Sequence, residues 1–339
     1  MMTRFAQSIL GHPGRLAMPI GVYAGLEITG GTIRDIVTDP KAQAAAVLAL
    51  HERLRTPILL TAMDLSAESE AFGCEIRMSP TEIPTVIGRK VTGPADLKTL
   101  PAPKPGDART AVHLESARLI RKAVVSPVVG CMIGPFSLAG RIFGVSEALE
   151  ATALEPEIIL ALLENVVEFQ IAYARAFRET GISAVIIAEP AAGLLSPAGL
   201  GRFSAPFVKR IVEGAQTWDF AVILHNCGAK LIHLDKVLES GAEIYHFGTP
   251  MDIVAALERA AGQVILGGNL DPAAVFLNGT PDSVRTATLA LLDATKDHKN
   301  YFISSGCDIP PGTPLVNLEA FYKAVADFSG RAHTAYLPS

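Results

Sequence analysis

The chain has 339 residues, with 29 Lys and Arg, 34 Asp and Glu, and a net charge of −5. This mild acidity, with basic residues scattered along the chain, argues against a nucleic-acid partner. Hydrophobic residues make up 49% of the chain, enough for the core of a fully covered parallel sheet. The longest uncharged run, 123–140, contains prolines and glycines, so it predicts a buried strand and loop rather than a membrane helix.

The N-terminus and the cysteines are typical of a cytoplasmic protein. A short apolar stretch follows Arg4, but the GHPG sequence at 11–14 interrupts it, so we predict no signal peptide. The cysteines are far apart and form no compact disulfide framework; they are Cys74, Cys131, Cys227 and Cys307. We therefore expect a cytoplasmic location and no membrane partner.

Short apolar runs rich in Val, Ile and Leu recur along the chain and predict buried parallel strands. They cover 18–25, 57–64, 127–134, 183–190, 220–227, 242–248, 263–269 and 301–307. Helical segments separate most of them, so the chain is predicted to form a closed (β/α)8 barrel, one domain over 1–339. The alternative is an open doubly wound sheet, but no G-x-G-x-x-G follows a strand to support it.

Pairs of a capping residue and a proline predict where several helices begin. These pairs are Asp39-Pro40, Ser196-Pro197, Thr249-Pro250, Asp271-Pro272, Thr280-Pro281 and Thr313-Pro314. The segment 65–106 is polar and rich in proline instead, and we predict that it is an excursion after the second strand, in the form of a hairpin or lid.

The predicted fifth strand ends in His225-Asn226-Cys227. Side chains alternate on an extended chain, so His225 and Cys227 are expected on the same side, where nitrogen and sulfur ligands suit Zn²⁺. The alternative is that Cys227 is a small core residue and His225 a hydrogen-bonded one. Cys307, at the end of the eighth strand, is expected at the same barrel mouth. It would complete a His-Cys-Cys set with an open fourth position, which is typical of catalytic zinc.

Other polar residues also lie at predicted strand ends, where the site of a barrel is found; they are Asp64, Glu189, His246, Asn269 and Asp308. The sulfur-rich set favours thiol alkylation over hydrolysis. Two thiolates balance the charge of Zn²⁺, and a substrate thiol bound as the fourth ligand must lose its proton yet stays nucleophilic.

Four stretches together resemble the uroporphyrinogen decarboxylase superfamily, and more closely its zinc methyltransferase branch, the methylcorrinoid:coenzyme M methyltransferases. They are MDLSAESEAFGCEI (63–76), AEPAAGLLSP (188–197), HNCG (225–228) and GCDIPPGTPLVNLEAF (306–321). The resemblance implies a (β/α)8 barrel and a zinc ion on His225, Cys227 and Cys307. The chain departs from true decarboxylases in two places. It reads GVYAGLEITG (21–30) where they have an arginine-rich RQAGR stretch, and Gly306-Cys307-Asp308 where they have a GHG-type motif.

The resemblance leads to the hypothesis of methyl transfer from a methylated corrinoid to a zinc-activated small thiol, such as coenzyme M or homocysteine. No DxHxxG motif is present, so we expect the corrinoid on a partner protein. Glu189 and His246 are candidates for accepting the thiol proton, and each equally suits a structural hydrogen-bonding role. Glu189 is also a candidate fourth zinc ligand. Asp64 and Asn269 are predicted to contact substrate, although Asp64 also suits holding a neighbouring loop.

Two other functions stay open on sequence grounds. One is a uroporphyrinogen-type decarboxylase, which needs neither metal nor thiol. The other is a non-catalytic barrel that binds a corrinoid or tetrapyrrole. Within the leading hypothesis, the acceptor is coenzyme M, homocysteine or tetrahydrofolate.

Overall fold

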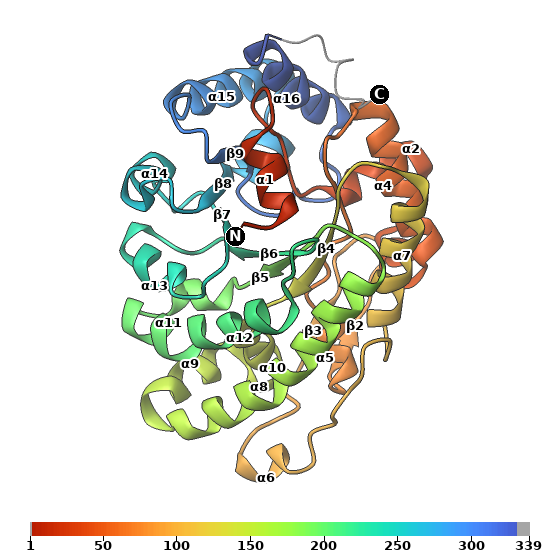
Figure 1. Ribbon diagram of the computed structural model, residues 1–339. Coiled ribbons are helices and arrows are strands. Elements are labelled where there is room, and N and C mark those ends of the chain that lie inside the picture. Colours follow the sequence, from red (N-terminus) through yellow and green to blue (C-terminus); the bar gives the residue numbers. More distant parts are fainter. Residues whose placement is uncertain (1, 331–339) are drawn as a thin grey trace.

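A curled parallel sheet forms the centre of the protein. The computed structural model describes residues 2–330. Seven parallel strands pair in the order β1-β4-β5-β6-β7-β8-β9, so neighbours in the sheet are also successive along the chain. Their bounds are β1 (Leu59–Leu60), β4 (Val128–Ile133), β5 (Ala184–Ala188), β6 (Ala221–Asn226), β7 (Ile244–Phe247), β8 (Ile265–Leu270) and β9 (Tyr301–Ser305). Figure 1 shows the strands at the centre with helices around them.

Helices connect each strand to the next and cover the outside of the sheet. The N-terminal part has α1 (Arg4–Leu10), η1 (Val22–Gly25), α2 (Leu26–Thr29), α3 (Ile33–Thr38), α4 (Pro40–Leu54) and α7 (Thr110–Ala123). The middle has α8 (Pro135–Phe143), α9 (Val145–Leu154), α10 (Pro156–Glu179), η2 (Ala191–Leu194), α11 (Pro197–Phe203) and α12 (Ala205–Ala215). The last part has η3 (Leu231–His233), α13 (Leu234–Leu238), α14 (Ile253–Ala260), η4 (Pro272–Leu277), α15 (Pro281–Ala294) and α16 (Leu315–Phe328). This alternation confirms the (β/α)8 barrel class.

The predicted first strand, 18–25, is wrong as a regular strand. Ala17 makes a single parallel bridge with Ile303 of β9, and the Met18 amide donates to the Ile303 carbonyl at 3.0 Å. The next amide that faces β9, that of Ile20, donates to the Ser305 side-chain oxygen rather than to a backbone carbonyl. Pro19 between them has no N–H, and residues 22–25 turn into η1. The segment 16–20 therefore occupies the first barrel position beside β9 without forming a full strand.

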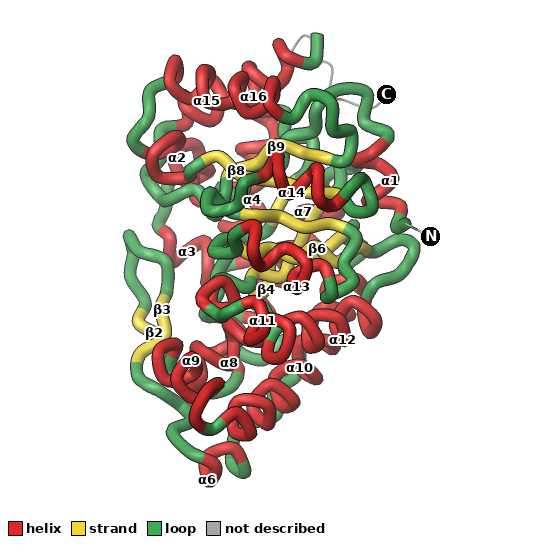
Figure 2. The backbone as a smooth tube through the Cα atoms, turned by 90° about the vertical axis from the view of Figure 1, so that its left-hand side faces the viewer, coloured by secondary structure: helices red, strands yellow, loops and turns green. Residues whose placement is uncertain are grey.

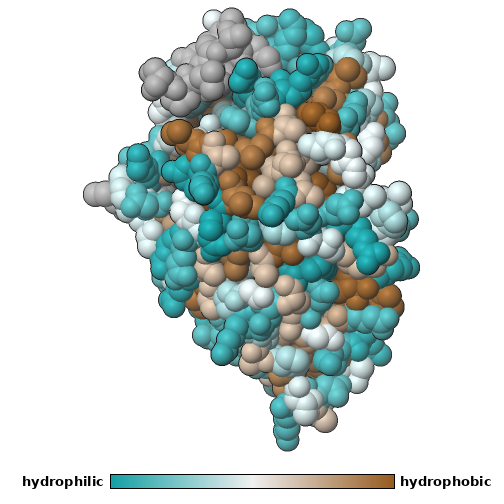
Figure 3. All heavy atoms as spheres, turned by 90° about the vertical axis from the view of Figure 1, so that its right-hand side faces the viewer, coloured by the Kyte–Doolittle hydropathy of each residue, from teal (hydrophilic) through white to brown (hydrophobic). Residues whose placement is uncertain are grey.

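The barrel has a seam between the segment 16–20 and β1, because no ladder joins them in the described part of the chain. An apolar cleft of about 410 Å³ lies there. Pro19 and Gly21 line it together with Leu60 of β1 and Leu318 of α16. Figure 3 shows hydrophobic side chains gathered on the face of the molecule that carries α2 and α4.

The excursion after the second predicted strand contains α5 (Ala67–Ala71), β2 (Glu75–Arg77), β3 (Thr85–Ile87) and α6 (Pro94–Leu97). β2 and β3 form an antiparallel pair, with Ile76 opposite Val86. Figure 2 shows this pair at the side of the molecule, away from the central strands. The single domain over 1–339 stays a prediction, and residues 1 and 331–339 lie outside the described part.

Four of the six predicted capping pairs begin helices as expected, because Asp39, Ser196, Asp271 and Thr280 each accept a backbone N–H of their helix. The other two are wrong. α14 begins at Ile253, where the Asp252 side chain caps it. α16 begins at Leu315, and the Thr313 hydroxyl instead donates to the Pro310 carbonyl. Among residues 2–330, no helix is long and apolar enough to cross a lipid bilayer.

Candidate metal centre

His225 lies at the carboxyl end of β6, inside the sheet. It pairs in register with Ala188 of β5 and with His246 of β7. Neighbouring residues in register point the same way from a parallel sheet, so the two imidazole rings meet, with centroids 4.7 Å apart. His225 is 1% exposed, so its ring nitrogens depend on protein partners or a bound ion.

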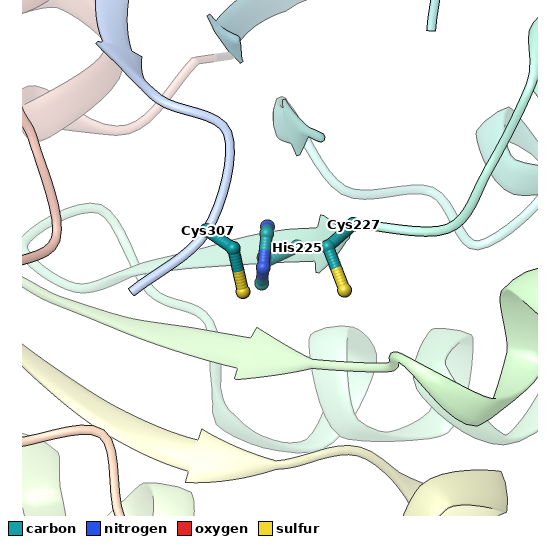
Figure 4. A group of neighbouring side chains, drawn as sticks. All are labelled: His225, Cys227 and Cys307. Carbon is teal, nitrogen blue, oxygen red and sulfur yellow. The ribbon is translucent and has the colours of Figure 1, made fainter. Parts of the chain in front are cut away.

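Cys227 and Cys307 follow the ends of β6 and β9, and the fold brings them beside His225. The nitrogen and sulfur ligand atoms of these three residues all lie within 4.8 Å of one another. Figure 4 shows His225 between the two cysteines, with both sulfur atoms on the same side. Among residues 2–330, this is the one group of His, Cys, Asp and Glu side chains close enough to hold a metal ion.

Two glycines allow this close approach. A Cβ atom at Gly248 would overlap the Cys227 carbonyl oxygen, and one at Gly306 would lie 2.9 Å from the Thr249 amide nitrogen. The loops after β6, β7 and β9 therefore pack backbone against backbone. Any side chain at these two positions would force the loops apart and with them the two cysteines.

The free side chains of this cluster fit a metal ion. Nε2 of His225 is buried and has no hydrogen-bond partner within the described residues. The Cys307 thiol shares its proton with the Cys227 sulfur, which lowers the pKa of Cys227 and, together with burial, raises the pKa of Cys307. The pair therefore carries two negative charges only beside a cation. One nitrogen and two sulfurs with an open position are a donor set suited to catalytic zinc.

A chain of hydrogen bonds behind His225 determines which of its nitrogens is free. The Ser304 hydroxyl lies 2.6 Å from the Met18 carbonyl oxygen, which can only accept. Ser304 Oγ, 2.6 Å from His246 Nε2, must then accept that nitrogen's proton. Burial lowers the pKa of His246 well below its usual range, so its ring is neutral and its Nδ1 is bare. That Nδ1 accepts from Nδ1 of His225 at 2.7 Å, which leaves Nε2 of His225 with a free lone pair.

Glu189 lies in another environment, at the N-terminus of α8. Its Oε1 accepts from the Phe136 amide at 2.9 Å and its Oε2 from the Ser137 amide at 2.9 Å. The hydroxyls of Ser137 and Ser204 donate to the same carboxylate at 2.7 and 3.2 Å. These hydrogen bonds lower the pKa of Glu189, but burial outweighs them and raises it above its usual value. Glu189 thus satisfies the first amides of a helix and is not part of the three-residue cluster.

Asp64, after β1, is buried beside Arg109, with which it forms an ion pair. The Ser66 hydroxyl donates to its Oδ1 at 2.6 Å, and His113 Nε2 lies 3.8 Å from its Oδ2. Burial alone would raise the pKa of Asp64, but the neighbouring His113 and the Arg109 charge outweigh burial and hold it at about 2. Arg109 also binds Glu70 of α5 at 2.7 Å, so it joins the strand end to the excursion.

The remaining predicted residues are less tightly grouped. The Asn269 amide donates to the Gly248 and Met251 carbonyls at 3.1 and 2.7 Å, which holds the loop after β7. Asp308 follows Cys307, and its carboxylate oxygens are buried without a hydrogen-bond partner in the described part of the chain. Glu68, on α5, follows the end of the second predicted strand and is a buried acid to which the sequence alone assigned no role. Burial raises its pKa to about 8, and it accepts from the Ile133 amide at 2.8 Å.

Sequence reasoning also missed Arg109 and Ser304. Arg109 directly precedes α7, after an irregular segment, and no pattern in the sequence marks it. Ser304 directly follows Ile303, the bridge partner of Ala17, so its hydrogen bond to the Met18 carbonyl depends on the register between β9 and the segment 16–20.

Comparisons with known proteins find similar chains over most of the length of this one. The family model for uroporphyrinogen decarboxylase (URO-D) matches residues 15–328. The methylcobamide:CoM methyltransferase MtbA of Methanosarcina mazei is 30% identical over 314 residues, covering 91% of each chain. The MtbA of Methanosarcina acetivorans is 29% identical over 308 residues, covering 89% of each chain. A solved methyltransferase structure from Methanosarcina mazei matches with a TM-score of 0.86 and 25% identity, covering 96% of this chain and 98% of the other.

Proposed function

The chain belongs to the uroporphyrinogen decarboxylase (URO-D) family, and within it we propose a zinc-dependent methyltransferase that moves a methyl group from a methylated corrinoid to a small thiol. One observation carries this proposal. His225, Cys227 and Cys307 converge at one barrel mouth, and Nε2 of His225 is buried without a hydrogen-bond partner among the described residues. The relatives support it, because they are methyltransferases that act between methylcobamide and CoM. The corrinoid is expected on a partner protein.

The reaction is a displacement between the two substrates. The thiol sulfur forms a bond to the methyl carbon while the methyl–cobalt bond breaks, and the bonding electron pair stays on cobalt as Co(I). The thiol proton is released. Zinc, when bound, supplies Lewis acidity that lowers the pKa of a thiol and leaves its sulfur nucleophilic near neutral pH.

The chain's own residues contribute position rather than acid–base chemistry. His225, Cys227 and Cys307 would hold the ion and leave its fourth position open to the thiol. We assign His246 and Ser304 to orienting His225, because both ring nitrogens of His246 are already hydrogen-bonded. We assign Glu189 to capping α8, since four donors surround its carboxylate. Asp64 and Asn269 are proposed to shape the substrate site through the loops that they hold.

Replacing Ser304 with alanine is expected to weaken zinc binding about 10- to 100-fold. Without the serine oxygen, His246 is free to move its proton to Nδ1, and Nε2 of His225 is then no longer fixed as the bare nitrogen. Competition with a coloured chelator measures the affinity. The matched control is S305A, because Ser305 is buried on the same strand but accepts from the Ile20 amide instead. Equal zinc affinity in S304A and wild type would show that the relay does not act on His225.

The function itself is tested by incubating zinc-loaded protein with methylcobalamin and a small thiol, either 2-mercaptoethanesulfonate or homocysteine. We expect the methylcobalamin absorption to decay and the methyl thioether to appear in the mass spectrum, well above the protein-free rate. A metal-free sample should be inactive. Decarboxylation of uroporphyrinogen by metal-free protein, with no thioether from any thiol, would favour the decarboxylase alternative.

A further inference from the structure

The two cysteines of the candidate metal centre are more accessible than the other two cysteines of the chain. Cys74 and Cys131 are buried, and the Cys131 thiol donates to the Thr61 carbonyl. Cys227 and Cys307 are partly exposed, so small solutes can reach them. Oxidants react with accessible thiols before buried ones, and oxidation of this chain is therefore expected at Cys227 and Cys307 first.

The sulfur atoms of Cys227 and Cys307 face each other although the two residues are far apart in the sequence. They are in hydrogen-bond contact, and with a ring nitrogen of His225 they form a set of atoms that all lie within 4.8 Å of one another. Figure 4 shows both sulfur atoms on the same side of the cluster. The close backbone contacts of Gly248 and Gly306 hold the loops that carry them. The pair is therefore placed for a reaction between its own two sulfurs.

A zinc ion and a disulfide bond need different separations of these two sulfurs. Zinc–sulfur bonds are about 2.3 Å long, so two thiolates on a tetrahedral ion lie about 3.8 Å apart. In a disulfide the sulfurs are about 2 Å apart, and neither keeps the negative charge that a zinc ligand carries. Only His225 would remain as a strong donor in the oxidised cluster. The two states thus exclude each other, because one imidazole does not hold zinc tightly.

We propose that Cys227 and Cys307 form a reversible disulfide when the centre is metal-free, so that oxidation closes the centre to zinc and reduction reopens it. The movement required is a rotation of the two side chains about their Cα–Cβ bonds, within loops that stay in place. The inference concerns the metal centre itself and does not depend on the reaction that the protein catalyses. It assigns a redox-sensitive modification site to the same two residues that would hold the ion.

The oxidation is balanced with hydrogen peroxide as the oxidant. One thiol sulfur attacks a peroxide oxygen, the O–O bond breaks, and a sulfenic acid and one water form. The sulfur of the second cysteine then attacks the sulfenic sulfur, the S–S bond forms, and the hydroxyl leaves with the second thiol proton as water. The pair loses two electrons, which the peroxide gains. A dithiol reductant reverses the change by thiol–disulfide exchange.

The test treats metal-free, reduced wild type with a small excess of hydrogen peroxide and then removes the peroxide. We expect the intact mass to fall by the two hydrogens lost. Digestion with trypsin without reductant should give one linked species made of the peptides 211–230 and 300–323, which contain Cys227 and Cys307. Zinc uptake, measured against a coloured chelator, should fall from about one ion per chain to near zero and return after dithiothreitol. Zinc added before the peroxide should protect the pair from linking.

The matched control is C131S, which should form the same link and lose zinc uptake to the same extent, because Cys131 takes no part in it. Circular dichroism before and after oxidation checks that the lost uptake does not come from unfolding. Equal zinc uptake by linked and reduced protein would show that the centre tolerates the disulfide, and the inference is then wrong. It is also wrong if peroxide yields sulfinic acids without the linked peptides, or if zinc does not slow the linking. A protein that links as expected but methylates no thiol after reduction and zinc loading leaves this inference standing and removes only the proposed function.

Discussion

Replacing Cys307 with serine is expected to lower the zinc content from about one ion per chain to near zero and to reduce thiol methylation about 1,000-fold or more. The reason is that a serine hydroxyl does not ionise near neutral pH and so cannot replace the thiolate ligand. Cys307 is also the one ligand that follows β9, so its loss leaves only two donors, His225 in β6 and Cys227 directly after it. Metal analysis by mass spectrometry and the methylcobalamin assay measure the two effects.

The matched control for this variant is C131S. Cys131 is a buried free cysteine on β4. Its thiol donates a hydrogen bond to the Thr61 carbonyl at 3.2 Å, and a serine hydroxyl can make the same hydrogen bond. C131S should retain both zinc and activity. A C307S protein that is folded, fully loaded with zinc and fully active would remove Cys307 from the metal centre and with it the main support for the proposed function.

Replacing Arg109 with methionine is expected to destabilise the protein by about 3–5 kcal/mol near pH 7. The substitution leaves Asp64 buried without its cation, and an unpaired buried carboxylate is far more costly than the lost ion pair is favourable. Urea unfolding of wild type and R109M measures the difference. The control is R118M, because Arg118 pairs with Glu115 at the surface, and exposed pairs contribute about 1 kcal/mol or less.

The pH dependence of R109M provides a second check. In wild type, the pKa of Asp64 is held at about 2, below its unfolded value of about 4. Ionised Asp64 therefore contributes stability above about pH 4, and this contribution is lost as the pH falls through about 2. In R109M the lowering effect of the Arg109 charge is lost and the pKa of Asp64 rises, so the deficit relative to wild type should shrink on acidification. A deficit that is small at pH 7, or that does not change with pH, would contradict the buried ion-pair account.

Hydropathy and composition along the chain were sufficient to predict the barrel. The runs that became β4 to β9 were identified because parallel strands covered on both faces read as continuous apolar segments. The run at 18–25 has the same composition, but Pro19 removes a ladder donor, and the chain turns into η1 at Val22. Apolar content alone does not distinguish a strand from an apolar segment that pairs at a single point.

The metal cluster was predictable for a related reason. Strand ends of a barrel meet at one mouth, so Cys307 was expected near His225 despite their distance in the chain. The hydrogen bonds around the cluster were not predictable in this way. That His246 contacts His225 depends on the register of β6 and β7, and that Glu189 caps α8 depends on how this helix packs over β5. Both contacts depend on tertiary packing, and no local sequence pattern indicates them.

The seam of the barrel has a consequence for how the molecule fluctuates. Residues 16–20 and β1 meet across an apolar cleft, so separating them breaks no ladder hydrogen bond within the described chain. Local opening of the sheet is least costly along this line. His225 lies in β6, and Cys227 and Cys307 follow the ends of β6 and β9, which an unbroken ladder through β7 and β8 connects. Local opening of the sheet at the seam therefore leaves the spacing of the three side chains unchanged. The most easily opened part of the barrel is thus separated from the candidate metal centre by continuous strand pairing.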